Sequence, residues 1–182
     1  MSLATDGLDA AHERHHGDAA DFGLLKDYRL VAKIFHWTTA ALVALMVSSG
    51  VAMTQLGGGP VADFLFGAHK LAGVGVLALV CLRGLYRLTA QIRGRWRAHV
   101  KPRRVHYLLY VMIIATPLLG WAGVSDFGAR AALFNIVLPA IWPEGAGYAD
   151  ALLSAHAYLA FGLLAIVCIH IGLALQDYIM RQ

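Results

Sequence analysis

The apolar positions of the chain fall into four long stretches, and each is long enough to cross a lipid bilayer as a helix. A spanning helix needs about 20 mostly apolar residues, and stretches of that length cover residues 34–54, 64–85, 106–125 and 153–175. A fifth stretch, residues 129–143, is shorter and contains two prolines, so we expect a short helix in the membrane interface between the third and fourth spans. The pattern predicts an all-α fold, an integral membrane four-helix bundle with up-down topology.

Composition narrows the class of protein. Of the 182 residues, 59% are hydrophobic and 14% are charged, whereas soluble domains contain about 45–50% apolar and about 25% charged residues. These values argue against a soluble enzyme and against a disordered chain. We expect residues 1–27 to form a polar, disordered cytoplasmic tail and residues 28–182 to form one membrane domain. Cys81 and Cys168 lie in apolar stretches, and the sequence has no CxxCH motif for covalent haem.

The positive charges are distributed unequally between the two ends of the predicted spans. Eleven basic residues flank the ends that would share a side with both termini, namely Lys26, Arg29, Lys33, Arg87, Arg93, Arg95, Arg97, Lys101, Arg103, Arg104 and Arg181. The opposite ends carry only Lys70 and Arg130. Because lysine and arginine accumulate on the cytoplasmic side, we expect both termini to be cytoplasmic. This orientation accounts for most of the basic charge, so we expect no binding to nucleic acid.

The histidines are the candidate functional residues. His12, His15 and His16 lie in the polar tail and His99 in the basic loop, but five others lie inside or at the edge of a span: His36, His69, His106, His156 and His170. An ionisable residue in a spanning segment is costly and is a functional hypothesis by default. The alternative is that they are core histidines that form hydrogen bonds across helices.

An interval of fourteen residues sorts these positions into two layers. Two residues fourteen positions apart on a helix point in directions that differ by about 40°, and they are separated by about 21 Å along the helix axis. His36, His69, His106 and His156 are followed at this interval by Gly50, Arg83, Gly120 and His170. With alternating helix directions, one set, the inner layer, lies toward the cytoplasm and contains His36, Arg83, His106 and His170. The other set, the outer layer, contains Gly50, His69, Gly120 and His156.

Facing imidazoles in two layers favour two b-type haems with bis-histidine ligation. Zinc would want four close ligands, and the four spans contain no acidic residue for a proton relay. Haem b needs two axial imidazoles and space for the macrocycle, which Gly50 and Gly120 would provide. Arg83 is placed to pair with haem propionates on the inner side. In the outer layer His69 and His156 are the only histidines, whereas His36 and His106 both remain possible partners of His170.

The sequence resembles the bacterial cytochrome b561 family over residues 28–178. The similar segments are YRLVAKIFHW, HKLAG, LRGLYRL, HYLLYVMIIATPLLG and SAHAYLAFGLLAIVCIHIGLAL, in this order. The resemblance implies two b haems, an inner one on His36 and His170 and an outer one on His69 and His156. It implies that His106 is a partner of a propionate or of the quinone site. Family members often carry histidines where this chain has Arg103, Gln176 and Asp177.

The resemblance implies electron transfer between a periplasmic donor and membrane quinone, with ubiquinone as the partner, in the bacterial inner membrane. Because bis-histidine ligation leaves no open iron position, we do not expect O₂ chemistry at iron. One hypothesis is an oxidoreductase that passes electrons from superoxide to ubiquinone, with Lys70 and Arg130 steering the anion. The alternative is a non-enzymatic subunit for a dehydrogenase or a soluble cytochrome, which acidic Asp126, Glu144 and Asp150 would suit. We expect Lys70 to raise the potential of the outer haem, and Arg83 and Arg87 that of the inner one.

Overall fold

The computed structural model describes the backbone of residues 3–93 and 104–180 and the side chains of residues 30–93 and 104–180. Four long helices account for most of this part of the chain: α1 (Leu3–Leu56), α2 (Pro60–Ile92), α3 (Arg104–Asp126) and α4 (Ala149–Ile179). Each is long and apolar enough to cross a membrane, with the span of α1 starting at Leu30. The predicted all-α membrane bundle is therefore confirmed.

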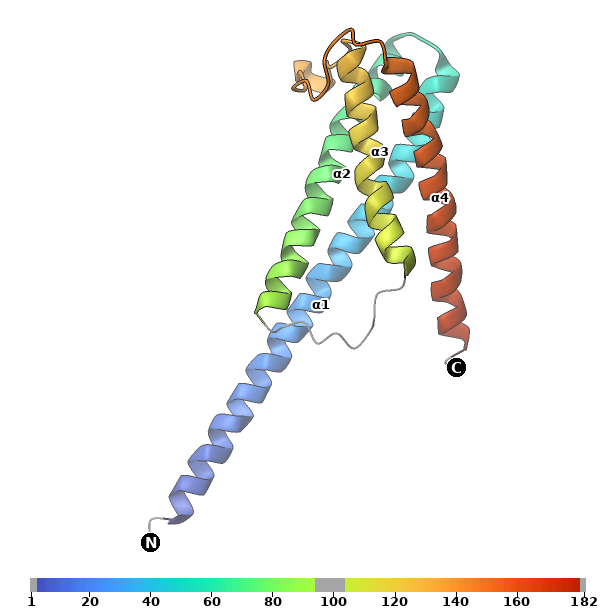
Figure 1. Ribbon diagram of the computed structural model, residues 1–182. Helices are drawn as coiled ribbons and strands as arrows, with labels where there is room; N and C mark the ends of the chain where they lie inside the picture. The colour runs from blue at the N-terminus through green and yellow to red at the C-terminus, as the bar shows by residue number, and fades with distance from the viewer. Residues whose placement is uncertain (1–2, 94–103, 181–182) are drawn as a thin grey trace.

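The helices alternate in direction and form two antiparallel pairs (Figure 1). α1 packs along α2 and α3 along α4, whereas the contacts of α2 with α3 and of α1 with α4 are less extensive. The α1–α2 and α3–α4 connections lie at one end of the bundle, which we call the closed end. The start of α3 and the ends of α2 and α4 lie at the opposite, open end. The cytoplasmic position of the open end stays a prediction.

Helix α1 continues beyond the bundle toward the N-terminus (Figure 1). Its backbone is helical from Leu3, while its apolar span begins at Leu30. The proposed boundary between residues 27 and 28 and the disorder of the tail stay predictions. Several residues named above have side chains or positions outside the described residues: His12, His15, His16, Lys26, Arg29, Arg95, Arg97, His99, Lys101, Arg103 and Arg181.

The bundle has a thin protein core and an apolar exterior. Buried apolar residues are few in the described part of the chain, and large exposed ones occur on all four helices, for example Trp37, Leu82, Val111 and Phe161. In water such a surface would be unfavourable, but lipid tails are as apolar as these side chains. Helices suit this environment because each satisfies its own backbone hydrogen bonds.

The connection between α3 and α4 corrects the predicted interfacial helix over residues 129–143. Helical structure in this segment is limited to one 3₁₀ turn, η1 (Leu133–Asn135). On either side of η1 the chain doubles back, so that the Ala132 amide donates to the Ile136 carbonyl and the Leu138 amide to the Arg130 carbonyl. These bonds take up backbone groups that a helix over residues 129–138 would use, and Pro139 and Pro143 have no amide hydrogen with which a helix could continue beyond them.

Buried polar groups at the end of α3 hold this connection in place. The Asp126 carboxylate is almost fully buried and accepts hydrogen bonds from the backbone amides of Gly147, at 3.2 Å, and Tyr148, at 2.6 Å. These amides directly precede α4, whose first amides need acceptors. The Trp121 indole donates to the Pro139 carbonyl at 2.9 Å. Asp126 thus joins the end of α3 to the start of α4.

Replacing Asp126 with alanine tests this joint. Asp126→Ala removes the buried acceptor of the Gly147 and Tyr148 amides, and we expect the protein to lose about 1–3 kcal/mol of stability. Thermal unfolding in detergent, followed by circular dichroism, measures the loss as a lower Tm. Asp150→Ala, an exposed carboxylate in the first turn of α4, is the matched control and should lower Tm much less. Equal effects of the two variants would show that only charge near α4 matters.

Candidate functional site

The structure brings the two histidines of the outer layer together. His69 on α2 and His156 on α4 face each other with ring centroids 6.0 Å apart and an interplanar angle of 85°. Each residue lies within three helical turns of the closed end, since α2 begins at Pro60 and α4 at Ala149. The fourteen-residue pattern predicted this shared level.

Hydrogen bonds orient both imidazoles of the outer layer. Nδ1 of His156 lies 2.8 Å from the Thr116 carbonyl, so this nitrogen carries the hydrogen and donates it. Nδ1 of His69 lies 3.1 Å from the Ser49 hydroxyl, which itself donates to the Met46 carbonyl. Because a hydroxyl has one hydrogen, Nδ1 of His69 donates to Ser49 in the tautomer in which Ser49 donates to Met46. In that tautomer both rings keep the lone pair on Nε2, the arrangement that a metal-ligating imidazole needs.

The sequence analysis missed Ser49 and Thr116 as partners of the histidines. A signal was present, because Ser49 directly precedes Gly50 and Thr116 stands one helical turn before Gly120. Each partner therefore lies beside a glycine of the outer layer, on a helix that carries no histidine in that layer.

Gly50 and Gly120 let the imidazoles lie against the helix backbones. A Cβ at Gly120 would lie 2.9 Å from Nδ1 and 3.0 Å from Cε1 of His156, closer than real contacts allow. A Cβ at Gly50 would lie 3.4 Å from Cε1 of His69. A side chain at Gly120 would thus collide with the His156 ring, whereas a Cβ at Gly50 would be at ordinary contact distance from His69; both glycines line the adjoining cavity.

A cavity of about 850 Å³ occupies the space between the helix pairs at this level. All four helices contribute to its wall, and the α3–α4 connection adds Ala129, Ala131, Ala132, Leu133 and Leu138. Most lining residues are apolar, and His69 and His156 are the histidines among them. The volume of the cavity lies within the range of roughly 300–1,000 Å³ that is typical of ligand and cofactor sites.

The two basic residues of the closed end have different surroundings. Lys70 lines the cavity and donates from Nζ to the Ala129 carbonyl at 3.0 Å, so its charge meets a neutral acceptor. Arg130 instead forms an ion pair with Glu144 at 3.3 Å and donates to the Leu138 carbonyl. The positive charge of Arg130 is therefore offset by a carboxylate, whereas that of Lys70 remains at the cavity wall.

Three histidines meet in the inner layer. The ring centroid of His170 on α4 lies 6.3 Å from that of His36 on α1 and 5.0 Å from that of His106 on α3. Both candidate partners of His170 that the spacing left open are thus its neighbours. The rings of His106 and His170 are in direct contact, whereas the 6.3 Å between those of His36 and His170 is close to the 6.0 Å of the outer pair.

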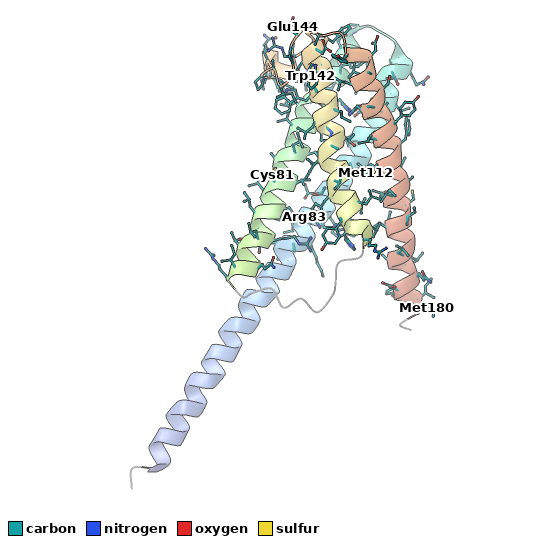
Figure 2. All side chains as sticks on the ribbon, in the orientation of Figure 1. Cys81, Arg83, Met112, Trp142, Glu144 and Met180 are labelled. Atoms are coloured by element: carbon teal, nitrogen blue, oxygen red, sulfur yellow. The ribbon has the colours of Figure 1, made fainter. Side chains whose placement is uncertain are left out.

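Two arginines of α2 gather around Tyr110 of α3 near the inner layer. Nη1 of Arg87 donates to the Tyr110 hydroxyl at 2.7 Å, and the Cζ atoms of Arg83 and Arg87 lie 5.7 Å and 6.0 Å from the ring centroid. Figure 2 shows Arg83 closer to the open end than Cys81 and Met112. Tyr110 was missed by the sequence analysis, although it follows His106 by one helical turn.

A family model described as prokaryotic cytochrome b561 matches residues 27–181. The chain belongs to the prokaryotic cytochrome b561 family. No curated protein matches it. Membership implies that this cytochrome binds haem b and transfers electrons across a membrane, and with its four spans it is a multi-pass bacterial membrane protein.

The site has the features that this cytochrome needs for haem b. A large apolar cavity suits the macrocycle, and it is lined by His69 and His156, whose Nδ1 atoms have partners on α1 and α3. Among the described residues no group of three or more His, Cys, Asp or Glu side chains is placed to hold a bare metal ion. A prosthetic group that needs only two imidazole ligands fits this donor set better than zinc does.

Filling the space at Gly120 tests the outer layer of the cytochrome. The added methyl group of Gly120→Ala must displace the His156 ring and weaken its hydrogen bond to Thr116. We expect haem affinity at this layer to fall about 10- to 100-fold, as for other changes to the support of a ligand. Haem content per protein, measured as the pyridine haemochrome, reports the loss. Gly75→Ala, where an added Cβ meets nothing within 4 Å, should retain full haem content; an equal loss there would contradict the explanation.

Proposed function

We propose that the protein is a di-haem cytochrome that carries electrons across the bacterial inner membrane to a quinone. The outer haem is held by His69 and His156, and the inner haem by His36 and His170. The observation that carries this proposal is the cavity of the outer layer, which His69 and His156 line together with Gly50 and Gly120. Bound haem b supplies reversible one-electron exchange between ferric and ferrous iron.

The two layers are spaced for a path through the bilayer. His156 and His170 lie on one face of α4 and are about 21 Å apart along its axis, compared with a hydrocarbon thickness of about 30 Å. Each layer therefore lies closer to one membrane surface. The helices keep the imidazoles in a water-poor interior, and two imidazoles on each iron leave no position for O₂.

His36, rather than His106, is the proposed partner of His170. The 6.3 Å between the His36 and His170 rings is close to the 6.0 Å of the outer pair, whereas His106 lies 5.0 Å from His170 in direct contact. His106 then lies beside the inner haem, on the helix that carries Tyr110. From this position it can contact a propionate or the headgroup of ubiquinone.

Arg83 and Arg87 are the proposed partners of the inner haem propionates. Their guanidinium groups lie near the same tyrosine ring on the side of the bundle that holds the inner layer. Two positive charges in a poorly hydrated site stabilise carboxylates and favour the reduced iron, which carries one positive charge less. The positive charge of Lys70, at the wall of the outer cavity, would likewise favour the reduced iron of the outer haem.

The open end is the proposed cytoplasmic end, and the closed end faces the periplasm. The described basic residues near the open end include Lys33, Arg87, Arg93 and Arg104. The closed end carries Lys70 and the paired Arg130. This asymmetry follows the rule that basic loops stay in the cytoplasm.

Superoxide is the proposed electron donor at the closed end. The supporting observation is the Lys70 ammonium group, which lines the outer cavity and donates to the Ala129 carbonyl rather than to a carboxylate. Two superoxide anions would release two electrons and leave as O₂, while ubiquinone takes up two electrons and two protons. The ion pair of Arg130 with Glu144 removes the second steering charge expected from the sequence.

A basic redox protein is the alternative donor. Asp126, one of the carboxylates expected to suit such a partner, is buried, and Glu144 is paired with Arg130. The closed end also exposes carboxylates at Asp63 and Asp150, and complementary charge is what such encounters use. In that case the cytochrome is a non-enzymatic electron-transfer or anchor subunit.

Single histidine replacements test the ligand assignment. We expect His69→Ala and His156→Ala each to lose the outer haem and keep the inner one, because one imidazole of the pair is gone. His36→Ala should lose the inner haem, whereas His106→Ala should keep both. Haem quantitation and the reduced-minus-oxidised spectrum measure the outcome. Loss of the inner haem in His106→Ala but not in His36→Ala would reverse the assignment, and a wild-type protein without a b-type α band would exclude the haem proposal.

Rapid mixing of the purified protein with superoxide tests the donor. We expect haem reduction within the mixing experiment and reoxidation when ubiquinone is added. Lys70→Gln should slow the reduction several-fold at low ionic strength, because a steering charge is lost, while Lys70→Arg should retain the rate. Absence of haem reduction by superoxide, combined with reduction by a basic cytochrome, would establish the alternative donor class.

A further inference from the structure

The tip of the α3–α4 connection has an unusual backbone. Phe134 has φ 58° and ψ 31°, and Asn135 has φ 57°; among the described residues these are the two non-glycine residues with positive φ. Asparagine tolerates this left-handed conformation, but for a bulky residue such as phenylalanine it is unfavourable. Such strain persists only where other interactions compensate for it.

The compensation for Phe134 does not come from packing within the described part of the chain. Its side chain is 86% exposed, more than that of any other large apolar residue described. Val137 and Ile136 beside it are 63% and 43% exposed. The turn therefore presents three apolar side chains outward.

The tip lies on the flank of the bundle at the closed end. Leu133 and Ala132 pack into a notch on α2 at Gly67, where an added Cβ would be 3.1 Å from Cδ2 and 3.2 Å from the backbone nitrogen of Leu133. Gly67 is seven residues from the first residue of α2, Pro60, which is about 10 Å along the helix axis. Figure 1 shows η1 at the side of the bundle next to α2.

The exposed apolar surface of the tip adjoins that of a membrane-spanning helix. Amphipathic elements that lie on a membrane bury their apolar face by about 5–10 Å at the boundary between lipid headgroups and acyl chains. The adjacent turns of α2 expose Val61 and Phe64 to the same surroundings, so the apolar surface of the tip continues that of a membrane-spanning helix.

The charge of the connection is compatible with such a position. Residues 127–148 contain two charged side chains, Arg130 and Glu144, and these form an ion pair with each other. No net charge has to leave water when the apolar tip enters the interface. Trp142 and Tyr148, which are half-exposed or exposed, pack edge to face nearby, and these residue types favour membrane interfaces.

We propose that the η1 tip is a membrane anchor, in which Phe134, Ile136 and Val137 insert into the lipid interface at the closed end. The same connection supplies the wall of the outer cavity through Ala129, Ala131 and Leu133. Lipid contact thus holds down the segment that covers the cavity. This inference goes beyond electron transfer and does not depend on which donor is used.

Depth measurement by spin labelling tests the anchor. The full-length holoprotein, with Cys81→Ala and Cys168→Ala, is placed at one copy per nanodisc of phosphatidylcholine and phosphatidylglycerol, with a nitroxide label at Phe134→Cys. Electron paramagnetic resonance then compares relaxation by O₂, which partitions into lipid, and by a water-soluble nickel chelate. Leu82→Cys, on the exposed apolar face of α2, is the lipid reference, and Ala146→Cys, two residues after Glu144, is the water reference.

We expect the ratio of O₂ to nickel relaxation at position 134 to be several-fold higher than at position 146 and to approach that at position 82. Val137→Cys provides a second site should the first variant fold poorly, and it should give the same ratio. A ratio at positions 134 and 137 equal to that at 146 would overturn the proposal. Protection from both reagents would also overturn it, because that result indicates a protein partner or a second copy on the tip.

Discussion

An imidazole inside a membrane-spanning bundle must have both ring nitrogens satisfied, and the outer layer is built around this requirement. Nδ1 of His156 is satisfied by the Thr116 carbonyl, and Nδ1 of His69 by the Ser49 hydroxyl. With no water available in the hydrocarbon region, each unpaired polar atom would be costly. Both residues also line an apolar cavity, so a group there that binds the two Nε2 atoms would satisfy the second nitrogen of each ring.

The glycines and the pairing of the helices follow from the same requirement. Each ring reaches its Nδ1 partner only by lying against the neighbouring helix, and Gly50 and Gly120 allow that approach. The helices associate mainly as α1 with α2 and α3 with α4, so the space between the two pairs remains open for a cofactor. The protein core is accordingly thin, and much of the packing that stabilises a soluble bundle would be replaced here by the bound group.

Backbone and side-chain hydrogen bonds hold the connection at the closed end against the helices. Asp126, almost fully buried, joins α3 to the start of α4, and Lys70 fastens the connection to α2 through the Ala129 carbonyl. Figure 2 shows Trp142 and Glu144 at this end, in the connection that closes it. The connection is thus both the link between two helices and a wall of the cavity, which is why its irregular backbone matters to the site.

Much of this molecule could be predicted from the order of its residues, because hydrophobic length, helical period and charge asymmetry are local properties. They determined four spans and their alternation, and the fourteen-residue interval brought His69 to the level of His156. Only the tertiary structure decided that Ser49, Thr116 and Tyr110 are the hydrogen-bond partners, because those contacts join residues far apart in the chain. It also replaced the expected interfacial helix by a single turn, since the notch at Gly67 and the bonds between residues 130 and 138 outweigh the local apolar pattern. Whether a segment forms a spanning helix depends on its own hydrophobic period, whereas the hydrogen-bond partner of a side chain on another helix depends on how the helices pack.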